Sequence, residues 1–308
     1  MWIKPWTMKE GFLTGGGLIF AGLMLELSVG PVAWDAFRWP VNGVVLAGLL
    51  AVIAIIFLLR KRVYALQFIG TNKAAIPALV YAVVLTIIMG LTRQEVNGTW
   101  LNSMLSFWPF VLIYVYIAVI LGQVVLRQLK TWAAAKFSIF HFPFSILSHL
   151  GLFLAMTTAT LGNADMQRLK MITVKGEPEW RALTSQQQIV EMPIAIELKE
   201  FIMETYDDGS PRRFASEVQI LTQTGKNIQT TVEVNKPVEV DGWKIYQYGY
   251  DTQMGAMSQT SILELVSDPW LPLVYTGIYM MLAGAVCMFL FGGRKNIAKS
   301  PNRQINSK

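Results

Sequence analysis

Residues 41–62 read VNGVVLAGLLAVIAIIFLLRKR, an apolar stretch that is closed by three cations. The apolar part, over 40–59, is within the ~17–25 residues that cross a bilayer as a helix. The composition of the whole chain agrees, because 53% of its 308 residues are apolar, only 15% are charged and the mean hydropathy is +0.42. A soluble domain carries about 25% charged residues. A wholly soluble enzyme, a disordered chain and a collagen are therefore excluded.

Five further apolar stretches lie on either side of this one. The pattern predicts membrane spans over 11–29, 40–59, 76–92, 107–126, 142–161 and 270–292. The first has no short apolar core with a small-residue cleavage site, so we expect an uncleaved span rather than a signal peptide. The sequence thus predicts a membrane domain of five helices over 1–161, a last helix over 270–292 and a basic tail over 293–308.

The positive charges predict the orientation of the spans. The two short loops on one side hold only Arg38 and Arg93, and the remaining basic residues of the membrane part lie on the side of both termini. They are Lys4, Lys9, Arg60, Lys61, Arg62, Lys73, Arg127, Lys130, Lys136, Arg294, Lys295, Lys299, Arg303 and Lys308. Cytoplasmic loops carry such an excess, so we expect both termini in the cytoplasm. The basic residues behind the net charge of +6 are therefore expected at the membrane surface, which disfavours a role in binding nucleic acid.

The segment 162–269 has a different character and is expected outside the cytoplasm. It holds ten basic and sixteen acidic residues, and apolar residues alternate with polar ones, as at Ile194, Ile196 and Leu198. Turn signals at Asp208-Gly209 and Asp241-Gly242 separate such runs. The pattern predicts a small, mostly antiparallel β-domain inserted before the last helix.

Few residues can carry chemistry. A single cysteine, Cys287, excludes a disulfide framework and a CxxC redox motif, and two histidines exclude a site built from several histidine ligands. His149 lies six residues after Pro143, where we expect the helix to begin, which is roughly 9 Å below the membrane boundary. An ionisable side chain at that depth indicates a haem ligand or a proton relay, or else a hydrogen bond that joins two helices. His141, which is expected at the headgroup level, is a second and weaker candidate for binding the same cofactor.

Two other features stand out. Glu26 lies near the outer end of the first span, where it could reach the interface or pair with a neighbouring helix. An aromatic cluster marks a possible partner or substrate surface in the β-domain, although core packing is its simpler explanation. Its members are Trp243, Tyr246, Tyr248 and Tyr250.

Several segments together resemble one known family. Residues 242–251, GWKIYQYGYD, resemble the G-x-x-I-Y-Q-x-x-Y-D segment of the ResB family, also called CcsB. Residues 234–237 (VNKP) resemble its approach to that segment, and 265–270 (LVSDPW) resemble its return into the last span. Residues 149–152 (HLGL) resemble the start of its helix before the external domain. The matches keep their order over about 140–290.

The resemblance implies a part in System II cytochrome c biogenesis in a bacterial inner membrane. It implies a polytopic partner of the ResC (CcsA) type, with which ResB carries haem b across the membrane and attaches it to CxxCH motifs of apocytochrome c. It also implies that His149 is a haem ligand, whereas His141 has no matching position. The tryptophan-rich haem-handling motif of the partner is missing from this sequence. We therefore expect a component of a holocytochrome c synthase that is not competent alone.

Two other functions fit the same sequence. One is a non-enzymatic membrane scaffold or sensor, in which the β-domain binds a partner protein and His149 is structural. The other is a secondary transporter, which the lack of an internal repeat disfavours.

Overall fold

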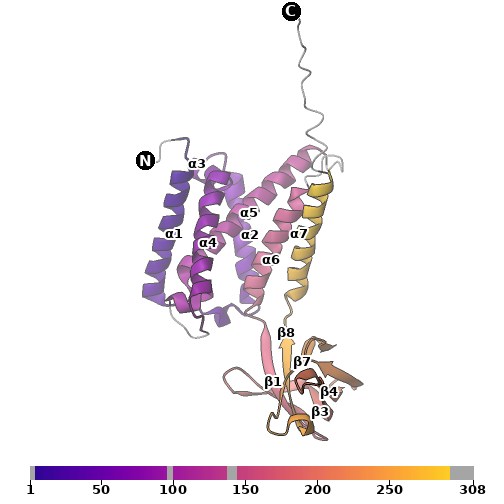
Figure 1. Cartoon of the computed structure of the whole chain (residues 1–308). Helices are drawn as coiled ribbons and strands as arrows, with labels where there is room; N and C mark the ends of the chain where they lie inside the picture. The colour runs from indigo at the N-terminus through magenta and orange to yellow at the C-terminus, as the bar shows by residue number, and fades with distance from the viewer. Residues whose placement is uncertain (1–3, 96–99, 137–143, 292–308) are drawn as a thin grey trace, which may run out of the picture. The chain divides into compact units, whose positions relative to one another are not determined.

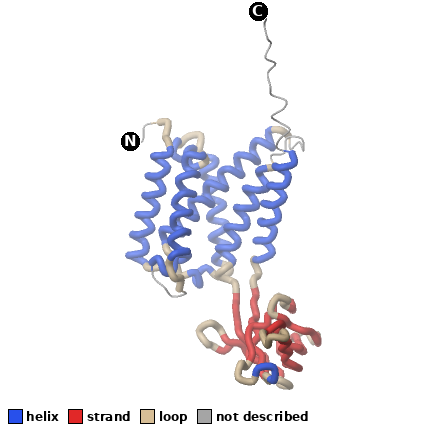
Figure 2. Tube along the Cα trace, viewed as in Figure 1, coloured by secondary structure: helices blue, strands red, loops and turns tan. Residues whose placement is uncertain are grey.

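The computed structural model describes residues 4–95, 100–136 and 144–291. Six helices in these ranges are long and apolar enough to cross a membrane, and an eight-stranded antiparallel sheet precedes the last of them (Figures 1 and 2). The six are α1 (Met8–Val29), α2 (Val41–Leu59), α4 (Asn72–Leu91), α5 (Trp108–Ala134), α6 (Ser145–Gly162) and α7 (Leu271–Phe291). The predicted fold class, a multi-pass membrane protein with an inserted β-domain, is confirmed.

Helix boundaries differ from the prediction mainly at α5. The predicted span ends at 126, whereas the helix continues to Ala134, because residues 126–130 (LRQLK) are all strong helix formers. α6 begins at Ser145, three residues later than predicted. A short helix, α3 (Tyr64–Ile69), was not predicted. The described residues also form three short 3₁₀ helices: Trp34–Phe37, Trp100–Ser106 and Gly255–Met257. The predicted tail, 293–308, lies outside the described residues.

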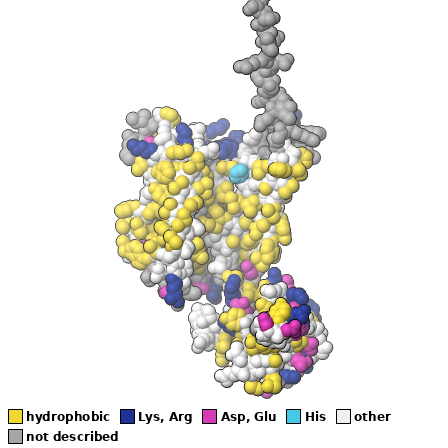
Figure 3. Space-filling model, viewed as in Figure 1, with side chains coloured by type: hydrophobic (Ala, Val, Ile, Leu, Met, Phe, Trp, Pro, Cys, Tyr) yellow, Lys and Arg dark blue, Asp and Glu magenta, His cyan; other side chains and the backbone are white. Residues whose placement is uncertain are grey.

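α5 is the centre of the helical unit. It packs against α1, α2, α4 and α6, and it is the most buried of the six spans. Two side chains of α5 reach backbone carbonyls on its neighbours: the Gln123 amide donates to Ile53 of α2 at 2.7 Å, and the Tyr114 hydroxyl donates to Met156 of α6 at 2.8 Å. The outer surface of the spans is mostly hydrophobic, with lysine and arginine near their ends (Figure 3). This distribution suits a bundle that faces lipid.

α6 and α7 form a close pair because glycines face each other across it. A Cβ added at Gly151 would lie 2.5 Å from the carbonyl oxygen of Gly277, and one added at Gly277 would lie 2.6 Å from the backbone nitrogen of Ala155. Farther along, a Cβ at Gly284 would meet the backbone of Ser148 at 2.6 Å. Small residues of this kind let helix backbones approach closely within a membrane.

Glu26 binds the beginning of α5. It is 6% exposed, and its carboxylate accepts a hydrogen bond from the backbone N–H of Trp108, the first residue of that helix, at 3.2 Å. An anion at a helix N-terminus satisfies an otherwise free N–H group and interacts favourably with the helix dipole. Of the two possibilities drawn from the sequence, pairing with a neighbouring helix is the one observed.

The β-domain comprises residues 165–269 as a compact unit, whereas the sequence predicted 162–269. Its strands are β1 (Gln167–Val174), β2 (Pro178–Leu183), β3 (Ile189–Thr205), β4 (Pro211–Thr222), β5 (Asn227–Glu233), β6 (Val238–Val240), β7 (Trp243–Tyr250) and β8 (Thr260–Ser267). They form one sheet in the order β5-β4-β3-β2-β1-β8-β7-β6. The sheet folds over a single apolar core, to which β1, β3, β4, β5, β7 and β8 all contribute.

A buried polar network joins strands that are distant in the sheet. The Ser216 hydroxyl of β4 lies 2.6 Å from Gln247 Oε1 of β7 and 2.7 Å from the Ser261 hydroxyl of β8. The Gln247 amide nitrogen donates to the Gly249 carbonyl at 2.8 Å, so both ends of the amide are satisfied. Gln247 thus fixes how the two halves of the sheet meet.

Both predicted turns are confirmed. Asp241 and Gly242 have positive φ values of 46° and 84° and connect β6 to β7 as a two-residue hairpin loop, the geometry that Asp-Gly favours. Gly209 has φ 80° in the loop between β3 and β4, where the Asp208 carboxylate accepts the N–H of Ser210 at 2.9 Å. The hydrogen bond that the Ser210 hydroxyl donates to the same carboxylate, and then this backbone contact, lower the pKa of Asp208.

Candidate functional site: the His149 edge of α6

His149 is the fifth residue of α6, one turn from the beginning of the helix. Its Nδ1 lies 2.6 Å from the carbonyl oxygen of Ser145. A carbonyl oxygen can only accept, so Nδ1 must carry a proton. In the neutral ring the other nitrogen, Nε2, then has a free lone pair. Within the part of the chain that the structure describes, Nε2 has no hydrogen-bond partner, and the side chain is partly exposed.

Gln128 approaches the Nδ1 edge of this ring from α5. Its Nε2 lies 3.0 Å from the Ser145 hydroxyl and 3.5 Å from His149 Nδ1. Its Oε1 is buried and has no hydrogen-bond partner among the described residues. Gln128 thus joins α5 to α6 through its amide nitrogen, while its buried amide oxygen, without a donor in the described part of the chain, costs about 1–3 kcal/mol.

The sequence did not single out Gln128 or Ser145. Gln128 follows Arg127, and a hydropathy criterion ends the span before that charge. The usable signal was the run of helix formers over 126–130, which extends α5 to the level of His149.

His149 lies closer to the beginning of its helix than predicted, because α6 begins at Ser145 and not at Pro143. Four residues separate it from the beginning of α6 at Ser145, which is roughly 6 Å along the axis instead of 9 Å. His149 therefore lies near one end of the span.

The other predicted ligand, His141, lies outside the described residues. Within residues 4–95, 100–136 and 144–291, no group of three or more His, Cys, Asp and Glu side chains could hold a metal ion. Among those residues, His149 Nε2 is the nitrogen of the site that could bind a metal ion. A single histidine would suit haem iron, because the porphyrin itself supplies four nitrogens.

The aromatic cluster of the β-domain divides between two faces of β7. Ile245 and Gln247 are buried, so the alternation of a strand places Tyr246 and Tyr248 on the outer face. Tyr248 is 55% exposed, and the Lys170 ammonium of β1 lies 3.7 Å from its ring centroid. This cation–π contact holds Tyr248 against β1 while leaving part of its ring exposed.

Trp243 and Tyr250 lie differently. Trp243 packs against the core, and Tyr250 stacks on Phe201 and Phe214 with ring centroids 4.8 and 5.1 Å apart. The irregular register between Gln247 and Gly249 shifts Tyr250 out of the alternation of Tyr246 and Tyr248. The candidate surface of β7 therefore consists of Tyr246 and Tyr248.

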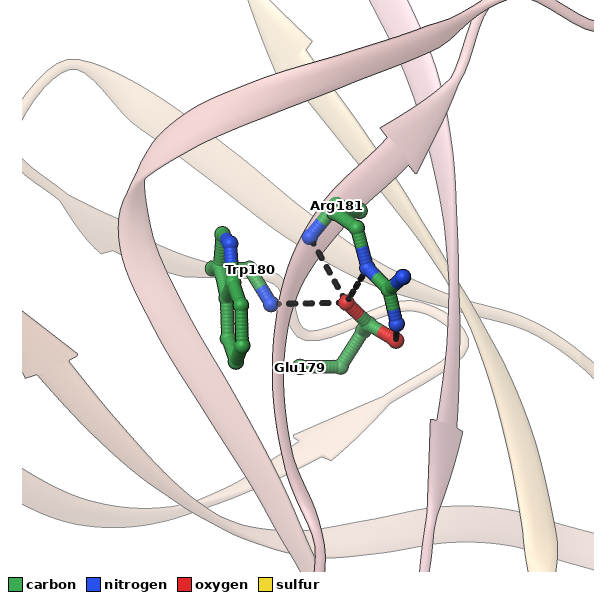
Figure 4. A network of polar contacts seen from close by, with 3 residues as sticks. All are labelled: Glu179, Trp180 and Arg181. Carbon is green, nitrogen blue, oxygen red and sulfur yellow. Dashed lines mark hydrogen bonds and ion pairs between the residues drawn. The ribbon is translucent and has the colours of Figure 1, made fainter.

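Ion pairs on the surface of the β-domain shift several ionisation equilibria. Glu179 forms an ion pair with Arg181 at 2.9 Å and accepts the backbone N–H of Trp180, and these contacts lower its pKa (Figure 4). Arg213 bridges Glu233 and Glu204 at 2.8 Å each. These hydrogen bonds raise the pKa of Arg213, and the one to Arg213 contributes most to lowering the pKa of Glu233. The pairs stabilise strands and are not arranged as a catalytic site.

Comparison with known proteins finds similar sequences and a similar solved structure. The model of the ResB-like family matches residues 127–262, which include the end of α5, His149 and most of the β-domain. The cytochrome c biogenesis protein CcsB of Prochlorococcus marinus subsp. pastoris (strain CCMP1986 / NIES-2087 / MED4) is 28% identical over 119 residues, which are 38% of this chain. The protein of the same name from Prochlorococcus marinus strain NATL1A is 28% identical over 102 residues, or 33% of this chain.

These matches cover only 27% and 23% of the lengths of the two relatives. Among solved structures, the chain is similar to cytochrome c heme lyase CcmF over 92% of its own length and 46% of that chain. The identity is 12% and the TM-score is 0.39, which is too low to establish a shared overall fold.

Proposed function

Residues 127–262 are a ResB-like segment, which confirms the resemblance drawn from the sequence, and on this premise we propose a function in cytochrome c biogenesis. The chain is a membrane subunit that binds haem through His149 and, with a ResC/CcsA-like partner, carries it across the membrane for attachment to apocytochrome c. Haem is the transported substrate in this proposal and not a resident cofactor. The chain is one component of the synthase and is not competent alone.

The unpartnered Nε2 of His149 is the observation that carries the proposal. A histidine that only joined two helices would use a ring nitrogen for a hydrogen bond to the neighbouring helix. Here Nδ1 donates within its own helix, to the Ser145 carbonyl one turn back, and Nε2 has no partner among the described residues. The nitrogen that can bind iron is the one that remains available.

The second axial ligand would come from the partner. With His149 supplying one nitrogen, a helix of the partner would supply the other, and the porphyrin would lie in an apolar slot between the two proteins. The outer face of β7, with Tyr246 and Tyr248, would bind the partner or apocytochrome c. In this proposal, other proteins reduce the haem iron and the cysteines of apocytochrome c.

The proposed orientation places both termini in the cytoplasm of a bacterium and residues 165–269 on the opposite side of the inner membrane. The excess of lysine and arginine on the side of the termini supports it. Cys287 is the single native cysteine, so a Cys287→Ser background permits labelling of single introduced cysteines. A cysteine at Ser185, which is exposed in the turn between β2 and β3, should react with an impermeant maleimide in intact spheroplasts, whereas one at Lys61 should react only after lysis.

The test of haem binding uses the chain co-expressed with its candidate partner. The complex is purified in detergent, and visible spectra are recorded in the oxidised and reduced states. The same is done for His149→Gly with and without imidazole, and for His141→Gly as the comparison at the other histidine. Haem bands that disappear in His149→Gly and return with imidazole would support an axial ligand at this position.

Haem bands that stay unchanged in His149→Gly would remove His149 from the site. A scaffold whose β-domain binds a partner would then be the better function, with Tyr246 and Tyr248 as its surface. If the intact wild-type complex contains no haem, the test moves to cells, where the yield of holocytochrome c is compared between wild type and His149→Gly.

A further inference from the structure

We infer that a cavity between the N-terminal segment, α3, α4 and α5 binds the phosphate headgroup of an anionic phospholipid, and that Lys73 and Arg127 hold this phosphate. The cavity has a volume of about 410 Å³, and its lining includes Trp6, Tyr64 and Phe68 besides the two cations. It lies beside α3, at the end of the spans that bears the N-terminus (Figure 1). The inference does not depend on the proposed function, because it involves neither haem nor His149.

The two cations lie at the level where the apolar spans end. Lys73 is the second residue of α4 and precedes the predicted span that begins at 76. Arg127 directly follows the predicted span that ends at 126, in the part of α5 that extends beyond it. The polar headgroups of a bilayer lie just outside its hydrocarbon core. The cavity is therefore at the level of the phosphates of the surrounding lipid.

Both cations can donate hydrogen bonds to a ligand. The Arg127 side chain is exposed, and its guanidinium has no ion pair or hydrogen-bond partner in the part of the chain that the structure describes. Lys73 Nζ donates to the Trp6 carbonyl oxygen at 3.1 Å. An ammonium group has three hydrogens, so two of those on Lys73 remain for a ligand. Arginine and lysine are the residues that bind phosphate oxygens most strongly.

The positive charge at this end of the spans is not balanced by nearby carboxylates of the sequence. Four segments lie on the side of the termini and outside the predicted spans: 1–10, 60–75, 127–141 and 293–308. They hold fourteen basic residues and one acidic residue, Glu10. The Glu10 carboxylate accepts the backbone N–H and the hydroxyl of Thr7 in a capping box at the beginning of α1. Anionic lipid is the counter-ion that a bilayer supplies to such a basic surface.

Contacts of Trp6 fix one wall of the cavity. Its backbone N–H donates to the Tyr64 hydroxyl at 3.0 Å, and its indole packs edge-on against Tyr64 and Phe68 with ring centroids 5.3 and 5.1 Å apart. The Tyr64 oxygen is the acceptor in this contact, so its own hydrogen can still point to a ligand. Tryptophan and tyrosine are common at the headgroup level of membrane proteins.

The face of α4 that continues from Lys73 suits an acyl chain. Ile76, Val80 and Val83 follow Lys73 at three, seven and ten residues, which places them on the same side of the helix. They are 42%, 42% and 56% exposed. A cation at the end of an exposed apolar stripe matches the two parts of a phospholipid, whereas a free phosphate ion would contact only the first. Basic pockets between membrane helices bind lipid headgroups in this manner.

The test uses the delipidated full chain in detergent micelles, with bound lipid measured by native mass spectrometry. The probes are dioleoyl-phosphatidylglycerol, the zwitterionic dioleoyl-phosphatidylcholine and inorganic phosphate. We expect one phosphatidylglycerol to bind more tightly than any further copy and more tightly than phosphatidylcholine, whose trimethylammonium group the two cations repel. Inorganic phosphate at the same concentration should not displace the bound lipid.

Two double variants separate the cavity from the general basic surface. Lys73→Gln/Arg127→Gln should weaken the binding of phosphatidylglycerol roughly tenfold or more, because charge-assisted hydrogen bonds are lost. Lys61→Gln/Arg62→Gln is the matched control: it also removes one lysine and one arginine, both exposed and on the same side, but neither lines the cavity. Its affinity for phosphatidylglycerol should stay close to that of wild type.

Three results would overturn the inference. The first is an equal affinity for phosphatidylglycerol in the two double variants, and the second is phosphatidylcholine that binds as tightly as phosphatidylglycerol. The third is displacement of the lipid by inorganic phosphate, which would make the cavity a site for the free ion. If Lys73→Gln/Arg127→Gln does not fold, Arg127→Gln alone decides, because that side chain has no partner among the described residues, and an unchanged affinity there would contradict the assignment.

Discussion

Replacement of Gly151 by alanine tests the packing of α6, the helix that carries His149, against α7. The added Cβ would lie 2.5 Å from the Gly277 carbonyl oxygen and 2.6 Å from the Met281 backbone nitrogen. Both atoms belong to the backbone, so neither can rotate away. Because ordinary contacts begin near 3.4 Å, the two helices would have to separate locally by about 0.9 Å, the difference between 3.4 and 2.5 Å.

Gly48→Ala on α2 is the matched control, because a Cβ there meets no atom within 4 Å. Both substitutions place alanine in a membrane helix, so the gain in helix propensity, up to about 1 kcal/mol, is common to both. The overpacking at Gly151 costs about 1–3 kcal/mol. The two variants should therefore differ by that amount in free energy of unfolding, which is roughly 5- to 150-fold in the ratio of folded to unfolded protein.

Unfolding is followed by tryptophan fluorescence during an SDS titration in mixed micelles, with both variants in the same detergent. Gly151→Ala should unfold at a lower SDS fraction than wild type, and Gly48→Ala at the same or a higher one. Equal midpoints for the two variants would refute the close approach of α6 and α7 at Gly151.

Three further outcomes follow from contacts in the two units. Glu26→Ala leaves the first N–H of α5, that of Trp108, without its acceptor, so it should lower the free energy of unfolding by about 1–2 kcal/mol in the same titration, and Glu26→Gln by less. Gln247→Leu removes the amide that hydrogen-bonds the buried hydroxyls of Ser216 and Ser261 and leaves them only each other, so the free energy of unfolding of the β-domain should fall by about 1–3 kcal/mol in thermal unfolding, whereas a variant as stable as wild type would argue against the network. Arg181→Met should raise the pKa of Glu179, as read from its ¹³C carboxyl shift. The pKa of Glu179 in the folded protein lies below its ordinary value near 4.3. Wild type should therefore be slightly more stable than Arg181→Met at neutral pH. This difference in the free energy of unfolding should disappear as the pH falls through the folded-state pKa of Glu179.

Much of the fold could be predicted from local patterns. Apolar length locates each of the six spans, and the alternation of Ile194, Ile196 and Leu198 gives the inward face of β3, where all three are buried. Asp241-Gly242 predicts a hairpin because its two positive φ values are accessible to Asp and Gly. These features depend on neighbours in sequence, so sequence suffices for them.

The surroundings of the site depend on contacts between distant residues. Gln128 and His149 are brought together by the packing of α5 on α6, and Gln247 meets Ser216 only because the sheet folds over its core. Hydropathy also ends a span at its first charge, whereas a helix ends where its backbone hydrogen bonds stop. α5 has 27 residues and a length of roughly 40 Å, longer than the bilayer core requires, and its extension carries Gln128.

His149 and Gly151 lie on one turn of α6 and face different neighbouring helices. Residues two positions apart lie roughly 200° around a helix, so a side chain at 149 that faces α5 puts position 151 on the side of α7. A ligand is held precisely only when the element that carries it is itself rigid. Gly151 supports α6 in this way, because it lets the backbone of α7 come into contact with it. On the side of α5, Gln128 lies beside the Nδ1 edge of the His149 ring. The segment 149–152 therefore joins the proposed ligand, His149, to the packing that supports it, and a larger residue at 151 should alter the position of the histidine without changing its chemistry.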